Sequence, residues 1–470
     1  MNEKHMCLKR LLLTAALVSG CFHILLGLMQ YYIDVSALRY VDYVLGGAVA
    51  VIAILYFAQN REALHRPSLE QGLLIALLIW YALSCFVMTA RFEGNWIIAN
   101  IEPYFDVCIS VLLLFTLGRF FARRGVGQLP KRLLHAALII WTILMVLVLV
   151  SILNNRIIDT PSGGQIGMNA DIALALNCNQ NTTGAIEIVF TLLCCCMVIW
   201  CRHPLLKILY VLASLVNFII LALSNSRTAL IATAIAFALL VGLAVFSRVH
   251  LRQTWQRLLL AFAVAIAAFA AFLALRRLVF YLHESITHLR ALLGQMSTGA
   301  GADAGGARSL TDATARTFSN RTLLWSAALQ AMVYDLQRFI FGVTPVSVIS
   351  MMRTISNGAL ELYTHNQFLE IGVALGAPGL CIFVVWTALI LRDAFRMLFV
   401  RKEGLRSLIV IAVVAALAIG NLTEATLLFY GFITGSVFFL LCGWISVRGE
   451  KEARKLTRQE QRRLERKRRK

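Results

Sequence analysis

Long apolar runs separated by short polar segments dominate this chain from residue 11 to residue 446. Each run holds about 17–23 residues, which is the length that crosses roughly 30 Å of hydrocarbon as a helix. Because helices satisfy their own backbone hydrogen bonds, the pattern predicts an all-α fold, a polytopic membrane bundle of about twelve transmembrane helices. The predicted spans lie near 11–31, 41–58, 71–89, 103–121, 133–153, 183–201, 205–223, 228–246, 256–275, 367–390, 406–421 and 427–446.

The composition supports a membrane protein and excludes a soluble globular one. Of 470 residues, 59% are hydrophobic and 14% are charged, whereas soluble domains hold about 45–50% apolar and about 25% charged residues. Part of the net charge of +20 comes from a basic tail, 447–470. We interpret this tail as a cytoplasmic segment that contacts anionic membrane lipids. Because no base-reading motif accompanies it, we expect no nucleic-acid partner.

The distribution of lysine and arginine predicts the orientation of the bundle, because cytoplasmic loops carry an excess of both. If the N-terminus is cytoplasmic, 32 of the 44 basic residues fall in inner segments. The short outer segments then hold only Arg39, Arg91, Arg156 and Arg227. We therefore expect both termini in the cytoplasm, with residues 1–446 forming a single integral membrane domain.

The first span contains a sequence that resembles a lipoprotein cleavage box, Val18-Ser19-Gly20-Cys21. It follows a basic start and a short apolar run, as such boxes do. However, the apolar run continues past Cys21 to Ile33, which is long for the hydrophobic region of a signal peptide. We expect an uncleaved first helix.

Two outer segments interrupt the hydrophobic pattern: 154–182, which is rich in Gly and Asn, and 276–366, the long extracytoplasmic loop. Within the second, the Gly/Ala/Asp-rich stretch 297–316 predicts a flexible flap. An amphipathic helix is predicted over 320–339 with Asn320 as N-cap. Its apolar residues recur at helical spacing, and they are Leu323, Leu324, Ala327, Ala328, Ala331 and Met332. Such a helix is expected at the membrane surface or on top of the bundle.

Two arginines on the outer side are candidates for binding an anion. Arg227 stands among small polar residues at the junction of two spans, and Arg321 follows the predicted N-cap, where a helix dipole is positive. Guanidinium groups bind phosphate oxygens with two parallel hydrogen bonds. The alternatives are an interfacial arginine that reaches toward water for Arg227, and a solvated arginine at a helix start for Arg321.

A histidine and several acids complete the candidate chemistry. His365 directly precedes the tenth span, and histidine can accept a proton near neutral pH, which makes it a candidate general base. Its alternative role is that of an interfacial polar residue. Glu424 either balances an arginine in a salt bridge or binds a sugar hydroxyl. Glu187 and Glu370 lie inside spans and are expected to face the bundle interior.

Read together, the motifs resemble those of the O-antigen ligase and polymerase family of bacterial glycosyltransferases over about residues 175–390. The matching motifs are Ser226-Arg227-Thr228-Ala229-Leu230, Arg321 to Ala328 followed by Phe341-Gly342, and His365-Asn366-Gln367 leading to Leu375-Gly376-Ala377-Pro378-Gly379. A weaker one, Asn179-Gln180-Asn181, resembles Asn-Pro-Asn. The chain departs from the family at Gly342-Val343-Thr344, where Gly-x-Gly is usual.

The resemblance implies a glycosyltransferase in the bacterial cytoplasmic membrane, with its active site facing outward. It implies a donor glycan linked to undecaprenyl diphosphate and transfer to an acceptor hydroxyl, without a metal or another cofactor. His365, Arg227 and Arg321 would be catalytic, and the expected substrate-binding residues are Ser226, Asn181, Asn366 and Glu424. Ligation and polymerisation, in lipopolysaccharide or capsule biosynthesis, both remain open.

Two other classes of protein remain as alternatives. A flippase or transporter of lipid-linked oligosaccharides should show repeat symmetry and charges near the middle of the bilayer. Here no internal repeat is visible, and the candidate residues cluster at one face. A membrane scaffold without catalysis would not require Arg227, Arg321 and His365 to converge.

Overall fold

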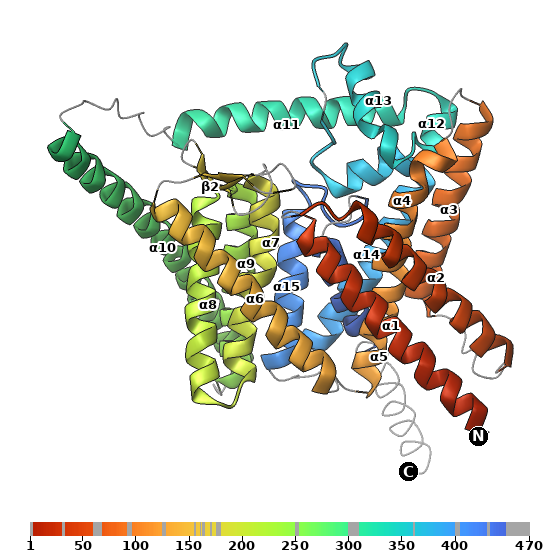
Figure 1. Ribbon diagram of the computed structural model, residues 1–470, viewed down its shortest axis with the longest axis horizontal. Helices are drawn as coiled ribbons and strands as arrows, with labels where there is room; N and C mark the ends of the chain where they lie inside the picture. Colours follow the sequence, from red (N-terminus) through yellow and green to blue (C-terminus); the bar gives the residue numbers. More distant parts are fainter. Residues whose placement is uncertain are drawn as a thin grey trace. The chain divides into compact units, whose positions relative to one another are not determined.

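The computed structural model is a helical membrane protein (Figure 1). Within its described residues, ten helices are long and apolar enough to cross a membrane, and two shorter apolar helices cover Ile409–Gly420 and Ile433–Val447. Each predicted span coincides with one of these helices, which confirms the fold class. The structure describes residues 3–30, 33–59, 68–91, 96–124, 128–154, 157–159, 161, 165–169, 172–174, 180–249, 253–298, 310–360, 362–399, 405–429 and 433–447. The predicted basic tail therefore lies, from residue 448, outside the described residues.

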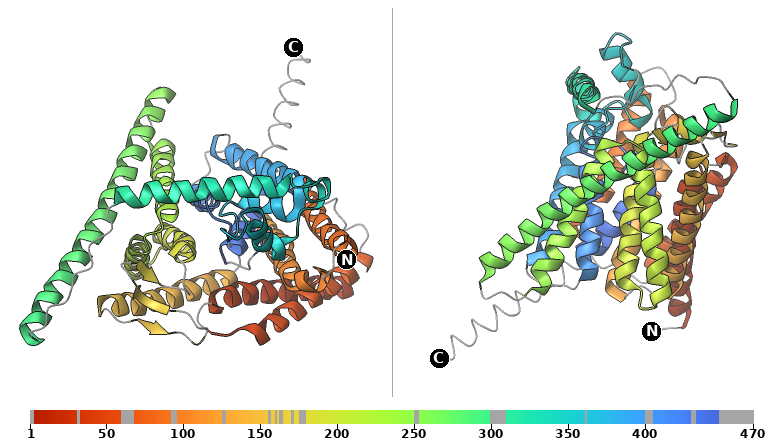
Figure 2. Two further views of the ribbon diagram at one scale, coloured as in Figure 1. Left: turned by 90° about the horizontal axis from the view of Figure 1, so that it is seen from above. Right: turned by 90° about the vertical axis from the view of Figure 1, so that its left-hand side faces the viewer.

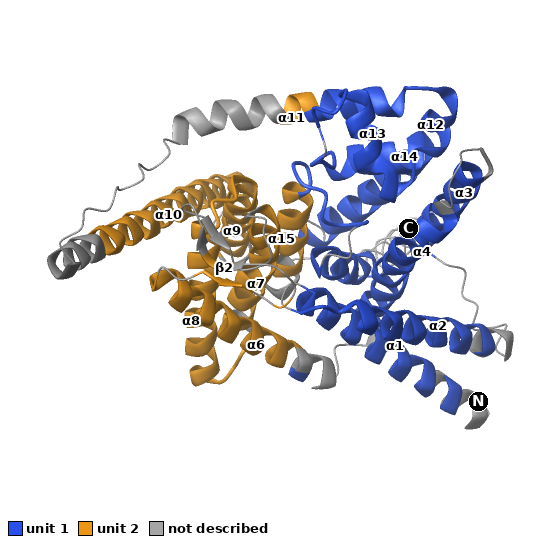
Figure 3. Cartoon of the chain, turned by 45° about the horizontal axis from the view of Figure 1, so that its top comes forward, with its two compact units in different colours: residues 1–132, 324–403, 421–470 blue, residues 133–323, 404–420 orange. Residues whose placement is uncertain are grey.

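The chain divides into two compact units, coloured separately in Figure 3. Unit 1 comprises Met1–Arg132, Leu324–Glu403 and Asn421–Lys470, and unit 2 comprises Leu133–Leu323 and Gly404–Gly420. Both units are assembled from segments that lie far apart in the sequence.

Unit 1 packs its N-terminal helices with helices from the C-terminal part of the chain. Its core surrounds Trp386, whose ring lies against Phe115, Phe383, Phe438 and Phe439. The elements of this unit are α1 (Glu3–Met29), α2 (Ser36–Gln59), α3 (Leu69–Arg91), α4 (Trp96–Val107), the π-helical η2 (Cys108–Leu114), α5 (Phe115–Arg124), α12 (Leu336–Phe341), the 3-10 turn η3 (Pro345–Ser347), α13 (Val348–Ile355), α14 (Gln367–Phe399) and the helix Ile433–Val447.

Unit 2 is built around α7 and α9, which pack on each other and on α15. Trp141 stacks on Phe190 in its core, with ring centroids 4.3 Å apart. Figure 2 shows α10 diverging from α8 and α9 toward its C-terminal end. The helices of this unit are α6 (Gln128–Leu153, from Leu133 onward), α7 (Gln180–Trp200), α8 (Pro204–Leu223), α9 (Arg227–Arg248), α10 (Thr254–Thr298) and α15 (Leu405–Gly420).

A small antiparallel sheet lies in the polar segment 154–182. Its strands β1 (Ile158–Asp159), β2 (Gln165–Asn169) and β3 (Ile172–Leu174) follow one another in sheet order. Ile158 pairs with Ile166, and Gly167 pairs with Leu174. The sequence predicted no strand here, because strands this short carry little periodicity.

The segment 276–366, predicted as a long loop, is mainly helical in its described residues, which corrects the prediction. α10 continues to Thr298, and α11 covers Leu310–Met332, so the expected flap is helical at both ends, while 299–309 lie outside the described residues. The predicted amphipathic helix starts ten residues earlier than expected, so Asn320 is not its N-cap. It also ends at Met332 and not at residue 339. A separate helix, α12, begins after Asp335, whose side chain accepts a hydrogen bond from the Arg338 N–H.

The apolar face of α11 is otherwise as the spacing predicts. Five of its six predicted members are buried, and Leu323 is 60% exposed. Met332, the last residue of this face, packs against α14, because a Cβ added at Gly372 would lie 2.6 Å from the Met332 sulfur.

Glycines allow α5 to approach the helix Ile433–Val447 at backbone distance. A Cβ at Gly118 would lie 1.9 Å from the Leu440 carbonyl oxygen, and one at Gly443 would lie 2.0 Å from that of Phe115. No side chain fits these positions without moving one helix away from the other.

We therefore expect Gly443→Val to destabilise unit 1, because overpacking costs about 1–3 kcal/mol and here backbone atoms collide. Thermal unfolding of the detergent-solubilised protein measures the effect. Gly47→Val is the matched control, since a Cβ at Gly47 meets nothing within 4 Å. Equal melting temperatures for the two variants would contradict this packing.

Candidate active site

The Ser226-Arg227 motif lies at a tight turn between α8 and α9. Ser224 closes the end of α8 by donating to the Leu221 carbonyl, and its hydroxyl accepts from the Ser226 N–H. Asn225 has a φ of 55°, a left-handed conformation that asparagine tolerates better than most residues. Arg227 is then the first residue of α9. The free N–H groups and the dipole at the start of this helix favour an anion.

Two further arginines gather at the start of α9. Arg321 of α11 donates from Nη1 to the Thr228 hydroxyl at 3.2 Å, and Arg276 of α10 donates from Nη2 to Asn225 Oδ1 at 3.3 Å. The charges of Arg276 and Arg227 are close enough to interact. Unit 2 thus brings three arginines, Arg227, Arg276 and Arg321, to one turn, and we call this group the arginine cluster.

The arginine cluster has the charge of an anion-binding site. Among the described residues, neither Arg227 nor Arg276 forms an ion pair. The Nε of Arg276 is buried without a hydrogen-bond partner there. Like charges this close repel one another unless an anion lies between them. From the sequence, we expected Arg321 to lie at a helix start, where the dipole is positive. Arg321 instead lies in the interior of α11, and the arginine at a helix start is Arg227.

Close packing of α7 on α9 fixes the position of this turn. A Cβ at Gly184 would lie 2.6 Å from the Ser226 Cβ and 2.7 Å from the Ala229 Cβ. Beside it, the Ser226 hydroxyl donates to Asn181 Oδ1 at 3.4 Å. The predicted substrate-binding residues Ser226 and Asn181 therefore meet, and they connect the arginine cluster to α7.

We expect Gly184→Ala to displace the start of α9 and to reduce activity about 10²-fold, as misplacement of about 1 Å can do. The glycan transfer that the resemblance implies, measured on the purified variant and normalised to folded protein, tests this effect. Gly47→Ala serves as the control in an open position. Wild-type activity of a folded Gly184→Ala protein would show that this contact does not set the geometry.

His365 pairs with Glu424 in unit 1. The two side chains approach to 2.9 Å between Nδ1 and Oε2, and the histidine ring lies 4.3 Å from that of Tyr363. Glu424 is 3% exposed, so its carboxylate holds the imidazole in one orientation. His365 has a φ of 50°, and such strain concentrates at functional sites.

Hydrogen bonds hold the segment around His365 to the loop that carries Glu424. Asn366 caps α14, with Oδ1 accepting from Phe368 N–H and Leu369 N–H, while Nδ2 donates to the Leu422 carbonyl. Gln367 accepts from the Leu427 N–H. These bonds position the His365–Glu424 pair, and substrate binding by Asn366 stays a prediction.

The glycine motifs on either side of His365 meet each other. Gly342 and Gly376 have φ of 71° and 69°, and the Val343 and Thr344 N–H groups donate to the carbonyls of Val373 and Ala374. α12 and α14 thus approach at backbone distance. Thr344 stands where the family usually has glycine. It adopts a φ of 67° and accepts a hydrogen bond from the Asn100 amide, so the turn is kept despite the substitution.

The sequence found most of these residues but missed some of their partners. Arg276 ends an apolar run, where a charge at a span boundary is a usable signal, and Tyr363 offers no signal of its own. Glu187 and Glu370 are fully buried, as predicted, and Glu370 accepts from the Thr364 N–H and hydroxyl. The arginine cluster belongs to unit 2 and the His365–Glu424 pair to unit 1.

Comparison with known proteins supports the family that the motifs indicate. Residues 209–384 match the family model described as O-antigen ligase. The matched stretch includes Ser226, Arg227, Arg321, His365 and Asn366, while Asn181 and Glu424 lie outside it. None of the curated proteins compared with the chain matches it.

Proposed function

Because residues 209–384 match the O-antigen ligase family model, we propose that this multi-pass membrane protein transfers a glycan from undecaprenyl diphosphate to an acceptor hydroxyl. The bacterial inner membrane is the proposed location, with both termini in the cytoplasm and the reaction on its outer face. The product is a surface polysaccharide, either ligated to a second molecule or lengthened by one repeat.

The observation that carries this proposal is the arginine cluster at the start of α9. A diphosphate leaving group develops negative charge as its bond to the sugar breaks. Fixed cations and helix N–H groups at the place where that charge develops lower the barrier. Arg227 and Arg321 would contact the diphosphate oxygens, and Arg276 would supply further positive charge. Charge stabilisation by arginines is consistent with transfer that needs no metal.

The His365–Glu424 pair supplies the base. The acceptor oxygen attacks the anomeric carbon while the bond from that carbon to the diphosphate oxygen breaks. The hydroxyl proton passes to Nε2 of His365, and undecaprenyl diphosphate leaves. Glu424 stabilises the resulting imidazolium through Nδ1–H, as a carboxylate does in other histidine-based catalytic pairs.

Reconstitution in proteoliposomes tests this function. The purified protein is supplied with an undecaprenyl diphosphate-linked repeat unit, an acceptor and EDTA, and the products are separated by size. We expect a covalently extended glycan and released undecaprenyl diphosphate. A ladder of repeats without added acceptor identifies a polymerase, and one product that depends on lipid A-core identifies a ligase. A donor that only crosses the bilayer, unchanged in mass, would identify a transporter and overturn the proposal.

A further inference from the structure

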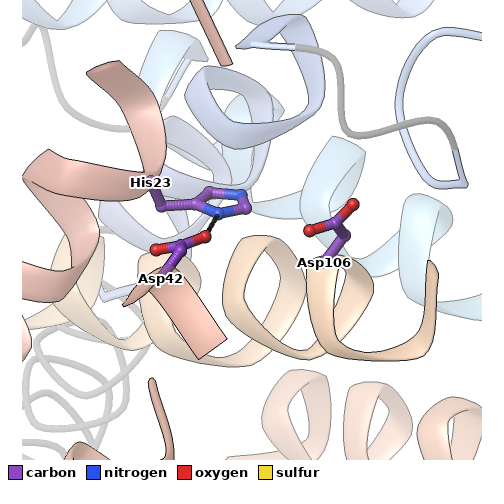
Figure 4. Close-up of side chains that lie close together, drawn as sticks. All are labelled: His23, Asp42 and Asp106. Atoms are coloured by element: carbon purple, nitrogen blue, oxygen red, sulfur yellow. Dashed lines mark hydrogen bonds and ion pairs between the residues drawn. The ribbon is translucent and has the colours of Figure 1, made fainter. Parts of the chain in front are cut away.

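A second group of ionisable side chains lies inside the membrane helices of unit 1, outside every motif described above. His23 of α1, Asp42 of α2 and Asp106 of α4 place one ring nitrogen and two carboxylate oxygens within 4.8 Å of one another. Figure 4 shows the Asp42 carboxylate against the imidazole and Asp106 on the other side of the ring. His23 is 5% exposed and Asp42 is fully buried. Charges buried among apolar helices are costly unless they are neutralised.

The hydrogen bonds of His23 orient its ring. Nδ1 lies 2.6 Å from Asp42 Oδ2, and Nε2 lies 2.9 Å from the Ser110 hydroxyl. Ser110 in turn lies 3.3 Å from the hydroxyl of Ser436, in the helix Ile433–Val447. A histidine that ligates a metal with one nitrogen usually donates from the other to such a partner. Ser110 belongs to the π-helical η2, and short π-helical segments are frequent at functional sites.

One polar atom in this group lacks a partner. Oδ1 of Asp42 is buried without a hydrogen-bond partner among the described residues. His23, Asp42 and Arg39 all lie close enough to Asp106 to interact with it, while the Arg39 Nη2 donates to Gln30. With a neutral imidazole, the two carboxylates carry a charge of −2, which a divalent cation neutralises.

We propose that His23, Asp42 and Asp106 form a binding site for a divalent transition-metal ion of the Zn²⁺ class. One imidazole nitrogen and two carboxylate oxygens suit zinc, with a fourth position open to water. Metal–ligand distances of about 2.0–2.2 Å place ligand atoms about 3.3–3.6 Å apart, so Nδ1 and Oδ2 separate by less than 1 Å on binding. The nitrogen ligand disfavours Mg²⁺ and Ca²⁺, which prefer oxygen.

The position of the site indicates a structural role. His23 lies six residues from the end of α1 and Asp42 six residues from the start of α2, or about 9 Å along each helix. α1, α2 and η2 pack closely here, since a Cβ at Gly20 would meet Leu114 at 3.0 Å and one at Gly46 would meet Ile109 at 3.1 Å. The ion would join these N-terminal helices, and Asp106, which is only partly buried, gives it access. This proposal does not depend on the proposed glycan transfer, in which the arginine cluster and not the metal ion stabilises the leaving diphosphate.

Metal content and thermal stability of the full chain test the site. The protein in nanodiscs is stripped with EDTA and equilibrated with Zn²⁺ or Mg²⁺, and bound metal is measured by mass spectrometry. We expect one Zn²⁺ per chain, a higher melting temperature with Zn²⁺ than with Mg²⁺, and loss of the ion in His23→Ala. Asp106→Asn, which keeps the shape of the side chain, should lose it as well and covers the case in which His23→Ala fails to fold.

Further variants and a labelling experiment distinguish a metal site from a hydrogen-bonded pair without metal. Ser110→Ala should weaken Zn²⁺ binding about 10–100-fold, as loss of an outer partner does. Asp34→Asn, an exposed acid between α1 and α2, should leave binding unchanged. The proposal would be overturned if the wild-type protein bound less than one equivalent of Zn²⁺, or if wild type and Asp106→Asn bound it equally. His23 and Asp42 would then form a hydrogen-bonded pair without a metal. Labelling of Ser110 by a fluorophosphonate would also overturn the proposal. It would show that Asp42 orients His23 and that His23 activates the Ser110 hydroxyl as a nucleophile.

Discussion

Replacing Arg227 with alanine is expected to reduce glycan transfer at least about 10²–10³-fold, as the loss of one preorganised charge-stabilising donor does. Arg227 starts α9, next to Arg276 and near the Thr228 hydroxyl that Arg321 contacts. Removing it takes away a full positive charge at the point where, in the proposed reaction, the leaving diphosphate becomes most negative. The loss should fall on kcat more than on KM, because that charge develops only in the transition state.

Two variants make this prediction specific. Arg227→Lys keeps the charge but not the two parallel N–H groups, so partial activity is expected, between that of wild type and that of the alanine variant. Arg277→Ala removes an exposed arginine adjacent to Arg276 and should remain fully active. If Arg277→Ala lost as much activity as Arg227→Ala, general positive charge at this end of unit 2 would explain the effect.

The second large effect is expected at the histidine. His365→Ala should reduce transfer about 10²–10⁴-fold, the usual contribution of a general base. Glu424→Gln should cost less, because the amide oxygen can still accept the Nδ1–H bond now made at 2.9 Å but no longer stabilises the imidazolium. Rates at a saturating donor concentration measure both effects, and circular dichroism verifies folding.

His288→Ala, at an exposed position of α10, is the matched control and should keep wild-type activity. The double variant His365→Ala/Glu424→Gln should be no slower than His365→Ala alone, because Glu424 acts through the imidazole. Additive losses in the double variant would contradict a shared role, and Glu424 would then contact substrate by itself.

The membrane helices could be predicted almost completely from the sequence. Apolar length alone specifies a transmembrane helix, since no other open element satisfies its backbone groups in lipid. The outer segments were harder to predict. α11 begins among the low-complexity residues before Asn320, where its apolar face gives no signal. It then ends at Met332, because Asp335 caps a new helix, a choice that the apolar spacing does not reveal.

The candidate site was predictable in its members but not in its partners. Ser226-Arg227 and His365-Asn366 stand out as polar pairs at the ends of apolar runs, and intramembrane polar residues are functional by default. Contacts such as Arg276 with Asn225 or His365 with Glu424 join residues 51 and 59 positions apart, and sequence spacing carries no information about them. The same rule, applied to His23, Asp42 and Asp106, would have found the proposed metal site.

A structure of the protein with bound undecaprenyl diphosphate would test whether the arginine cluster holds the diphosphate. We expect diphosphate oxygens within about 3 Å of the guanidinium groups of Arg227 and Arg321, at the start of α9. A diphosphate bound away from α9, with Arg321 still on Thr228, would contradict it.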